Sequence, residues 1–340
     1  MKSRESGIDL LRCVGLLFVV GVHSFLKNGY YGQMQVGAVI WAANSWRWLF
    51  YCCNGIFMML TGYLKTKKPF SLAYYKSLIP ILVSYGLICL FTFPIRHFLL
   101  GEEKSVAEWF SVCIEFGNYA WYLEMYIGLL LISPIINLAL DGLQTPAKQL
   151  MLTGVMLFLT AVPSLTPWPF TPDYWTSLYP ITYYMIGALI KRLQPKTNTW
   201  VCLSVVAGVA MFLGLVSVLS TDKTVSDGFG QGYGGFYITL ITTALFLGLY
   251  RLSFSERMGR VLAWMAEGCF EGYLLSRLLD VWAYNLFPKW HTPEGYPLLF
   301  LCVTIPIYVL SLLAGKGIHC LTAWCLRKLQ KKPGVLSSPG

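Results

Sequence analysis

Long apolar runs separated by short polar segments fill the chain almost to its last dozen residues. Each run is close to the roughly 20 residues with which a helix crosses a hydrocarbon core about 30 Å thick. A closed barrel, the other fold that satisfies backbone groups in lipid, needs strands of alternating polarity, and the sequence shows no such alternation. The pattern therefore predicts an all-α fold, a polytopic membrane helix bundle of about ten transmembrane helices. We place them at residues 8–26, 45–64, 75–95, 119–140, 149–165, 175–192, 199–219, 234–251, 262–287 and 297–320.

The basic residues between these runs are distributed unevenly. With the N-terminus inside, 18 of the 26 lysines and arginines fall at inner ends or loops, and five fall in outer loops. Because cytoplasmic loops carry such an excess, we expect both termini in the cytoplasm. The first run contains Arg12 and His23, and no cleavage site follows it, so we expect it to be retained. The predicted organisation is one transmembrane domain over residues 1–328 and a disordered cytoplasmic tail over 329–340.

Composition supports a membrane protein and narrows its chemistry. Hydrophobic residues make up 56% of the chain and charged residues only 12%, about half of what a soluble surface needs. The formal net charge of +10 could suggest nucleic acid, but basic cytoplasmic loops explain it better, so we expect no nucleic-acid partner. The ten cysteines form no C-x-x-C pair, so we interpret them as small buried apolar residues and expect no metal.

Three ionisable residues lie in the first apolar run: Asp9, Arg12 and His23. Such residues within a span mark a functional site by default. Eleven positions separate Arg12 from His23, which is three helical turns plus about 20°, so both project from one face about 16 Å apart. Arg12 would then lie near the cytoplasmic surface and His23 in the outer leaflet. The simpler alternatives are a snorkelling arginine and a histidine that only joins two helices.

The predicted topology brings other ionisable residues to the depth of His23. They are Glu124 in the fourth span and Arg277 and Asp280 in the ninth. A histidine and a carboxylate at one depth suggest a polar cavity with a general base and its orienting partner. The alternative is an Asp280–Arg277 pair that neutralises itself.

A second group of residues lies at the cytoplasmic ends of the spans and is basic. Such a cluster suits a phosphorylated ligand. The alternative, which we favour for most of its lysines, is contact with anionic lipid. The cluster consists of Arg12, Lys65, Lys67, Lys68, Lys76, Arg257 and Arg260.

Five segments then resemble, in the right order, the motifs of the acyltransferase-3 family of membrane acyltransferases. The first is GIDLLRCVGLLFVVGVHSF at residues 7–25, with the family's Arg and His separated by ten residues. The others are CNGIFMMLTGYL at 53–64, AWYLEMYIGLLLISPII at 120–136, YPITYYMIGALI at 179–190 and CFEGYLLSRLLD at 269–280. The third is most similar to a Gram-positive branch that includes the membrane domain of membrane-bound serine racemases linked to glycopeptide resistance.

The resemblance implies a multi-pass protein of the bacterial cytoplasmic membrane. It implies transfer of an acyl group, usually acetyl, from cytoplasmic acyl-CoA to a hydroxyl of a cell-envelope glycan or related acceptor. His23 would be the catalytic histidine and Arg12 its companion toward the donor. Two departures concern the family's R-x-x-R at the third helix, where only Lys76 stands, and its late histidine, where Ser276 and Arg277 stand.

We therefore assign the following roles. His23 acts as general base, oriented by Glu124 or Asp280, and Arg277 or a backbone donor stabilises the oxyanion. The expected donor-binding residues are Arg12, Lys68, Lys76 and Arg257, and the expected substrate-binding residues are Arg277, Trp121, Tyr122 and Asn54.

Other functions and partners are left open by the sequence. The main rival is a transporter of an amino acid or lipid-linked substrate, although transporters often contain inverted repeats and this sequence shows none. A family member acting as a sensor or scaffold is the third reading. Membrane lipids and a second copy of the chain are the expected partners besides the substrates.

Overall fold

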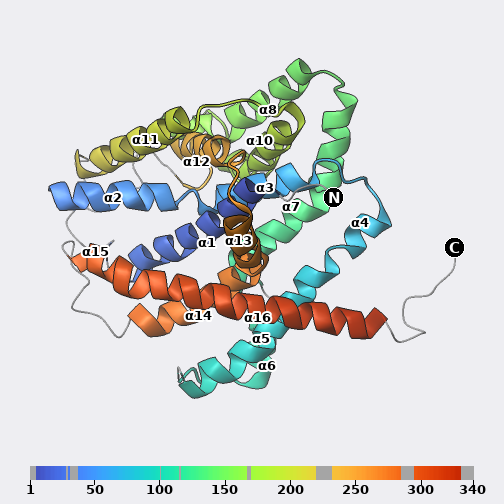
Figure 1. Ribbon diagram of the computed structural model, residues 1–340, viewed down its shortest axis with the longest axis vertical. Coiled ribbons are helices and arrows are strands. Elements are labelled where there is room, and N and C mark those ends of the chain that lie inside the picture. Colours follow the sequence, from blue (N-terminus) through green and yellow to red (C-terminus); the bar gives the residue numbers. More distant parts are fainter. Residues whose placement is uncertain are drawn as a thin grey trace.

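The computed structural model describes residues 5–27, 30, 37–99, 101–114, 116–166, 170–219, 232–284 and 295–330. The predicted tail from residue 331 onward lies outside these ranges, whereas residues 329 and 330 belong to the last helix. Every element in the described part of the chain is helical, as predicted, and Figure 1 shows the helices gathered into one bundle.

The helices follow the chain in the order α1 (Ser6–Lys27), α2 (Ala38–Phe50), α3 (Cys53–Lys65), α4 (Leu72–Lys76), α5 (Ile79–Leu99), α6 (Val106–Ile114), α7 (Phe116–Gly142), α8 (Pro146–Thr160), the short η2 (Val162–Leu165), α9 (Asp173–Thr176), α10 (Tyr179–Leu193), α11 (Thr199–Leu219), α12 (Phe236–Leu249), α13 (Glu256–Glu267), α14 (Cys269–Tyr284), α15 (Tyr296–Leu299), the π-helical η5 (Phe300–Thr304) and α16 (Ile305–Gln330).

Helices occupy every predicted span, but not all are long enough to cross a membrane unbroken. Five described stretches have the length and the apolar character to do so. They are Ser6–Lys27, Leu72–Phe98, Trp121–Gly142, Thr199–Leu219 and Tyr296–Lys328. The other predicted spans correspond to shorter helices or to two consecutive ones. The protein is therefore a helical membrane protein.

The second predicted span, at 45–64, starts seven residues too late compared with the structure. It consists of α2 and α3, and α2 starts at Ala38. Polar residues concealed this start, because polar groups in a helix look like a loop unless their partners are known. Asn44 is buried and accepts a hydrogen bond from the Tyr30 hydroxyl at 2.5 Å, and the Ser45 hydroxyl donates to the Trp41 carbonyl at 2.8 Å.

The ninth predicted span, at 262–287, is not one helix. Gly268 ends α13, and α14 begins directly after it. A Cβ atom at this position would lie 2.7 Å from the Lys316 backbone nitrogen of α16. Glycine therefore allows α16 to pass against the chain where the two helices meet.

The helices around α1 alternate in direction. Gly15 of α1 faces Phe57 of α3, and Gly21 faces Phe50 just before it, so the second helical segment runs opposite to α1. Ser311 of α16 approaches Gly272 of α14, and Lys316, further along α16, approaches Gly268 just before α14, so these two helices are also antiparallel.

Polar contacts fix α7 along α3. The Thr61 hydroxyl donates to the Tyr126 hydroxyl at 3.4 Å, and the Asn137 amide donates to the Lys65 carbonyl at 2.8 Å. The two helices α3 and α7 therefore run parallel to each other. Asn137 also donates to the Lys68 carbonyl at 3.0 Å, so its amide satisfies two backbone oxygens at the end of α3.

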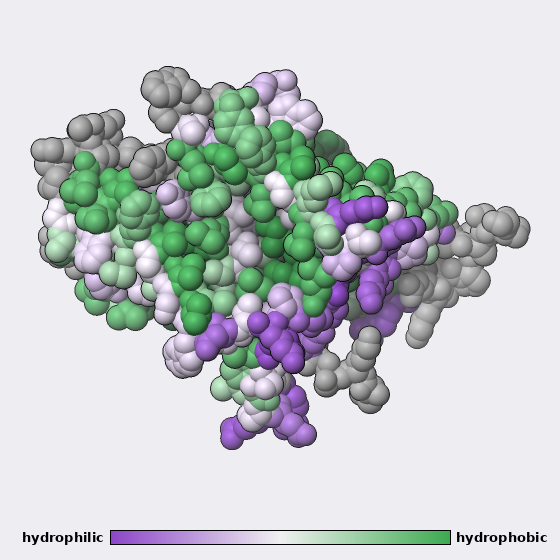
Figure 2. Space-filling view, turned by 90° about the horizontal axis from the view of Figure 1, so that it is seen from above, coloured by the Kyte–Doolittle hydropathy of each residue, from purple (hydrophilic) through white to green (hydrophobic). Residues whose placement is uncertain are grey.

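The exterior has the character expected of a chain that faces lipid. Figure 2 shows a broad hydrophobic face, with hydrophilic residues gathered toward the lower edge and the right-hand side. The same side of Figure 1 holds the first turn of α1 and the last turn of α16. Large apolar side chains such as Trp200, Leu219 and Leu301 are exposed on the outer helices, so the apolar surface extends well beyond an interior core.

The backbones of α3 and α10 approach each other closely. A Cβ atom on Gly62 would collide with the Tyr184 carbonyl oxygen, and one on Gly187 would collide with the Met59 carbonyl oxygen. Small residues let membrane helices approach in this way. The contact holds α3, and with it the residues that α3 contributes to the interior.

We predict that Gly62→Ala lowers the free energy of unfolding by about 1–3 kcal/mol, because the new methyl group forces the two backbones apart. Gly208→Ala in α11 is the matched control, since nothing lies within 4 Å of its added Cβ. The control is expected to be neutral or slightly stabilising. Thermal unfolding of the purified variants in detergent measures both, and equal behaviour of the two variants would contradict the proposed contact.

Candidate functional site

The centre of the candidate site is a histidine–carboxylate pair between α1 and α14. His23 Nδ1 lies 2.5 Å from Asp280 Oδ2. The Asp280 side chain is 1% exposed and the His23 side chain 24% exposed. The carboxylate is therefore shielded, while part of the imidazole ring remains accessible.

This geometry fixes how the imidazole can act. When Nδ1 carries the proton and donates a hydrogen bond to Asp280, the lone pair of Nε2 is left to accept a proton from another group. The carboxylate also stabilises the positive charge that the ring then acquires. The arrangement is that of a general base with its orienting partner.

The structure separates the residues that the sequence placed at this depth. Asp280, rather than Glu124, pairs with His23, and the Glu124 side chain is exposed on α7. Arg277 is half-buried one turn before Asp280. The alternative of a self-neutralising Asp280–Arg277 pair does not describe the carboxylate, because Oδ2 meets His23 and Oδ1 accepts no hydrogen bond within the described chain.

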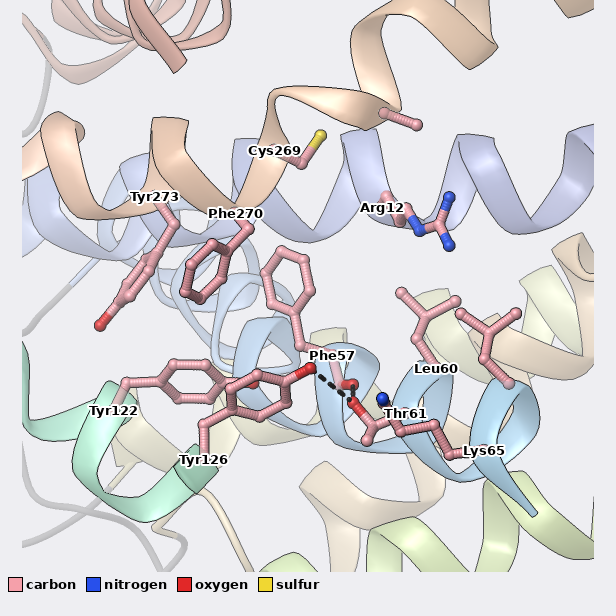
Figure 3. Close-up of a pocket in the computed structure, with 12 residues that line it drawn as sticks. Arg12, Phe57, Leu60, Thr61, Lys65, Tyr122, Tyr126, Cys269, Phe270 and Tyr273 are labelled. Carbon is pink, nitrogen blue, oxygen red and sulfur yellow. Dashed lines mark hydrogen bonds between the residues drawn. The ribbon is translucent and has the colours of Figure 1, made fainter. Parts of the chain in front are cut away.

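Arg12 lies on the same face of α1 and opens onto a pocket. Its guanidinium is 2.8 Å from Asp9 Oδ1 and its side chain is 29% exposed. The pocket has a volume of about 170 Å³ and lies between α1, α3, α7 and α14. Figure 3 shows Arg12 and Lys65 at one end and the rings of Tyr122 and Tyr273 at the other.

The contacts of α1 with α14 place the pocket and the histidine pair along one helix pair. Arg12 shares its pocket with Cys269 and Tyr273, at the start of α14, whereas His23 meets Asp280 further along. The two helices therefore run in parallel. Arg12 and His23 are about 16 Å apart along the axis of α1. Arg12 lines the pocket, whereas His23 and Asp280 lie beyond its lining residues.

The other three predicted donor-binding residues do not line this pocket. Lys68, Lys76 and Arg257 are exposed, and Arg12 and Lys65 are its two cationic lining residues. The basic character of the cluster was predictable from the sequence. Which of its members turn inward depends on helix rotation, which the sequence alone did not fix.

Some of the predicted substrate-binding residues are buried near the pocket, and others are exposed. Tyr122 and Asn54 are 4% and 3% exposed. Trp121 is 39% exposed and packs against Tyr233, with ring centroids 5.6 Å apart. Tyr122 lines the pocket, and Asn54 lies one turn before the pocket residue Phe57.

Aromatic residues that sequence reasoning missed form much of the wall. Tyr126 stacks on Tyr122 with centroids 5.8 Å apart, and Tyr273 meets Tyr122 edge-on at 5.2 Å. Tyrosines are common in this chain, so none stood out as a site residue. The signal was their spacing: Tyr122 and Tyr126 are four residues apart on one helix, which places both on one face.

A second histidine–carboxylate pair lies on the opposite side of α14. Glu271 Oε1 accepts a hydrogen bond from Ser84 at 2.9 Å and lies 3.2 Å from His319 Nδ1. Ser84 and Thr322 share a hydrogen bond of 2.9 Å. Glu271 therefore ties α14 to α5 and α16 and does not line the Arg12 pocket.

The described residues hold no group of three or more His, Cys, Asp or Glu side chains arranged to bind a metal ion. The ten cysteines are all free. The site therefore consists of a histidine–carboxylate pair and, nearer the start of α1, an aromatic pocket with two cationic lining residues.

Comparison with known proteins gives one match. The sequence profile of the Acyl_transf_3 family, described as an acyltransferase domain, matches residues 5–316. The matched region includes both α1 and α14, which carry the histidine pair. No curated protein and no solved structure matches the chain.

We predict that Glu271→Gln leaves the melting temperature unchanged or raises it. Glu271 is 4% exposed and its Oε2 accepts no hydrogen bond in the described chain, so a neutral amide avoids burying a charge while still accepting from Ser84. Glu271→Ala is expected to destabilise, because it removes that acceptor and leaves a void. Thermal unfolding in detergent compares the two. Equal destabilisation by Gln and Ala would show instead that the charge paired with His319 holds these helices together.

Proposed function

Because the chain belongs to the acyltransferase-3 family of membrane acyltransferases, we propose that it transfers an acyl group, acetyl in the first instance, from cytoplasmic acyl-CoA to a hydroxyl of a cell-envelope glycan or related acceptor. The observation that carries this proposal is the His23–Asp280 pair, at 2.5 Å, on the face of α1 that also bears Arg12. The family supplies the reaction class, and the pair supplies the base that acyl transfer to a hydroxyl needs.

The proposed step conserves atoms and charge. His23 Nε2 removes the proton of the acceptor hydroxyl, and the oxygen attacks the thioester carbonyl carbon. The resulting tetrahedral intermediate collapses by breaking the C–S bond. The thiolate of CoA then takes the proton back from the imidazolium, giving the acyl ester and free CoA thiol. Asp280 holds the ring and stabilises its transient positive charge.

The Arg12 pocket is the proposed donor side. A guanidinium offers five hydrogen-bond donors, so Arg12 can bind a phosphate while it remains paired with Asp9. Lys65 adds a second cation at the same end of the pocket. The exposed Lys68, Lys76 and Arg257 attract an anionic donor at longer range.

The alternating helix directions support the proposed topology of ten spans with both termini in the cytoplasm. In that topology the first and ninth spans run from inside to outside, and the second, fourth and tenth run back. The contacts of α1 with α14, of α3 with α1 and of α16 with α14 have these relative directions. Arg12 would then face the cytoplasmic donor, and His23 would face an acceptor that enters from the outer side.

We predict that His23→Ala lowers the rate of acyl transfer by a factor of about 10²–10⁴, because the base is lost. It also lowers the melting temperature, because the buried Asp280 carboxylate loses its partner. His319→Ala is the matched control, since His319 also faces a carboxylate but lies outside the proposed site. Transfer of label from [¹⁴C]acetyl-CoA to an envelope fraction measures both. A His23→Ala variant with normal turnover would rule out the base, and counterflow of an unmodified solute by the wild type in liposomes would favour transport.

We predict that reporter fusions will show the proposed topology. Alkaline phosphatase joined after residue 102 follows three spans and is expected to be active, because it reaches the periplasmic or outer side. The same reporter joined after residue 144 follows four spans and is expected to be inactive, whereas green fluorescent protein at that position should fluoresce. The opposite pattern would contradict the cytoplasmic N-terminus.

A further inference from the structure

Two buried hydrogen-bond donors near the Arg12 pocket have no partner within the described chain. They are the hydroxyl of Tyr122 and the side-chain nitrogen of Asn54. Both residues are more than nine-tenths buried, at 4% and 3% exposure. Buried polar side chains are nearly always hydrogen-bonded, and each exception calls for an explanation.

The two donors face the same interior region. Asn54 lies on the face of α3 that carries Phe57 and Thr61, because these residues follow at three and seven positions. Phe57 and Thr61 line the pocket. Tyr122 packs against Phe57 with ring centroids 6.3 Å apart, and Figure 3 shows its ring extending from α7 toward α3.

Cys53 orients the amide of Asn54. Its thiol donates to Asn54 Oδ1 at 3.7 Å, which occupies the amide oxygen and leaves the nitrogen as the unsatisfied end. The unsatisfied nitrogen therefore lies at the start of α3.

The depth of this region is intermediate between the two ends of the proposed site. Phe57, beside Tyr122, lies against Gly15 of α1, one turn beyond Arg12. Asn54 is one further turn toward Phe50, which lies against Gly21, close to His23. Along α1, the two donors therefore lie between the levels of Arg12 and His23.

We propose that the Tyr122 hydroxyl and the Asn54 amide form the oxyanion hole of the acyl transfer. This inference rests on the proposed function. When the acceptor oxygen attacks, the thioester carbonyl becomes a tetrahedral carbon with a negatively charged oxygen, and two preorganised donors in a dry site stabilise that charge. The role falls to neutral donors of α7 and α3 rather than to Arg277, which the sequence had suggested for it.

This assignment explains why the donors are unsatisfied in the structure. A donor aimed at the transition state has to be free of other partners before the substrate binds, so that no hydrogen bond must break during the reaction. Tyr126 provides the contrast. Its ring stacks on Tyr122, but its hydroxyl accepts a hydrogen bond from Thr61 at 3.4 Å.

The test compares Tyr122→Phe with Tyr74→Phe in [¹⁴C]acetyl transfer to an envelope fraction. Tyr122→Phe is expected to lower kcat by a factor of about 10²–10³ with the KM for acetyl-CoA unchanged, because the hydroxyl acts only on the transition state. Its melting temperature should stay the same or rise, since an unsatisfied buried hydroxyl is removed. Tyr74 is equally buried, but its hydroxyl donates to the Leu130 carbonyl at 2.8 Å and it does not line the Arg12 pocket, so Tyr74→Phe is expected to keep its kcat within a factor of about three of wild type.

A second variant addresses whether the two donors act together. Asn54→Ala is expected to lower kcat to a similar extent, and the double variant with Tyr122→Phe should lose less than the product of the single losses. A Tyr122→Phe variant that keeps at least half of the wild-type kcat would overturn the oxyanion hole. So would a raised KM with a lowered melting temperature, which indicates a structural role.

His23→Ala separates this inference from the function on which it rests. If the wild type transfers label and His23→Ala does not, while Tyr122→Phe is fully active, only the oxyanion hole is wrong. If the wild type itself transfers no label, the proposed function fails and the oxyanion hole fails with it.

Discussion

Water is absent from the hydrocarbon region of a membrane, so every ionisable group placed there has to find its partner inside the protein. For this chain that constraint is met most clearly by Asp280. It is 1% exposed and meets His23 at 2.5 Å. Because an unpaired buried carboxylate is costly, the pair requires α1 and α14 to lie side by side in one register. The rest of the proposed site follows from that register.

This register of α1 and α14 arranges the polar groups of the proposed site in order of depth. Arg12 lies at one end, the donors of Tyr122 and Asn54 lie at an intermediate depth, and His23 lies beyond them. The proposed acyl transfer across the membrane needs this order, because the proposed charged donor and an acceptor on the other side must meet at one carbonyl carbon. The buried network around Glu271, on the other side of α14, holds α5 and α16 against the helix that carries Asp280.

The sequence predicted the fold class well, because the length and apolarity of the runs depend directly on the bilayer. It also predicted that Arg12 and His23 lie on the same face of one helix, since a fixed rotation per residue relates their positions. The breaks in the helices were harder to predict. Gly268 ends a helix because α16 passes against it, and that contact connects residues distant in the sequence.

The partners across helices were predicted only in part. Depth in the membrane alone could not distinguish Glu124 from Asp280 as the partner of His23. In the structure α7 is rotated so that Glu124 points outward, and Asp280 is the partner. Tyr122 was singled out with the right motif, but its missing hydrogen-bond partner is visible only in three dimensions. A sequence can therefore show which helices carry the chemistry, whereas the packing decides which side chains meet.

Chemical rescue tests the central claim, that the ring of His23 accepts the proton, most directly. The variant His23→Gly leaves a space beside Asp280 that free imidazole can occupy, and acyl transfer from labelled acetyl-CoA is measured as imidazole is added. The account predicts a rate that rises with imidazole concentration and then saturates, with no such rise for the wild type. A His23→Gly variant that is as active as the wild type without imidazole would contradict it.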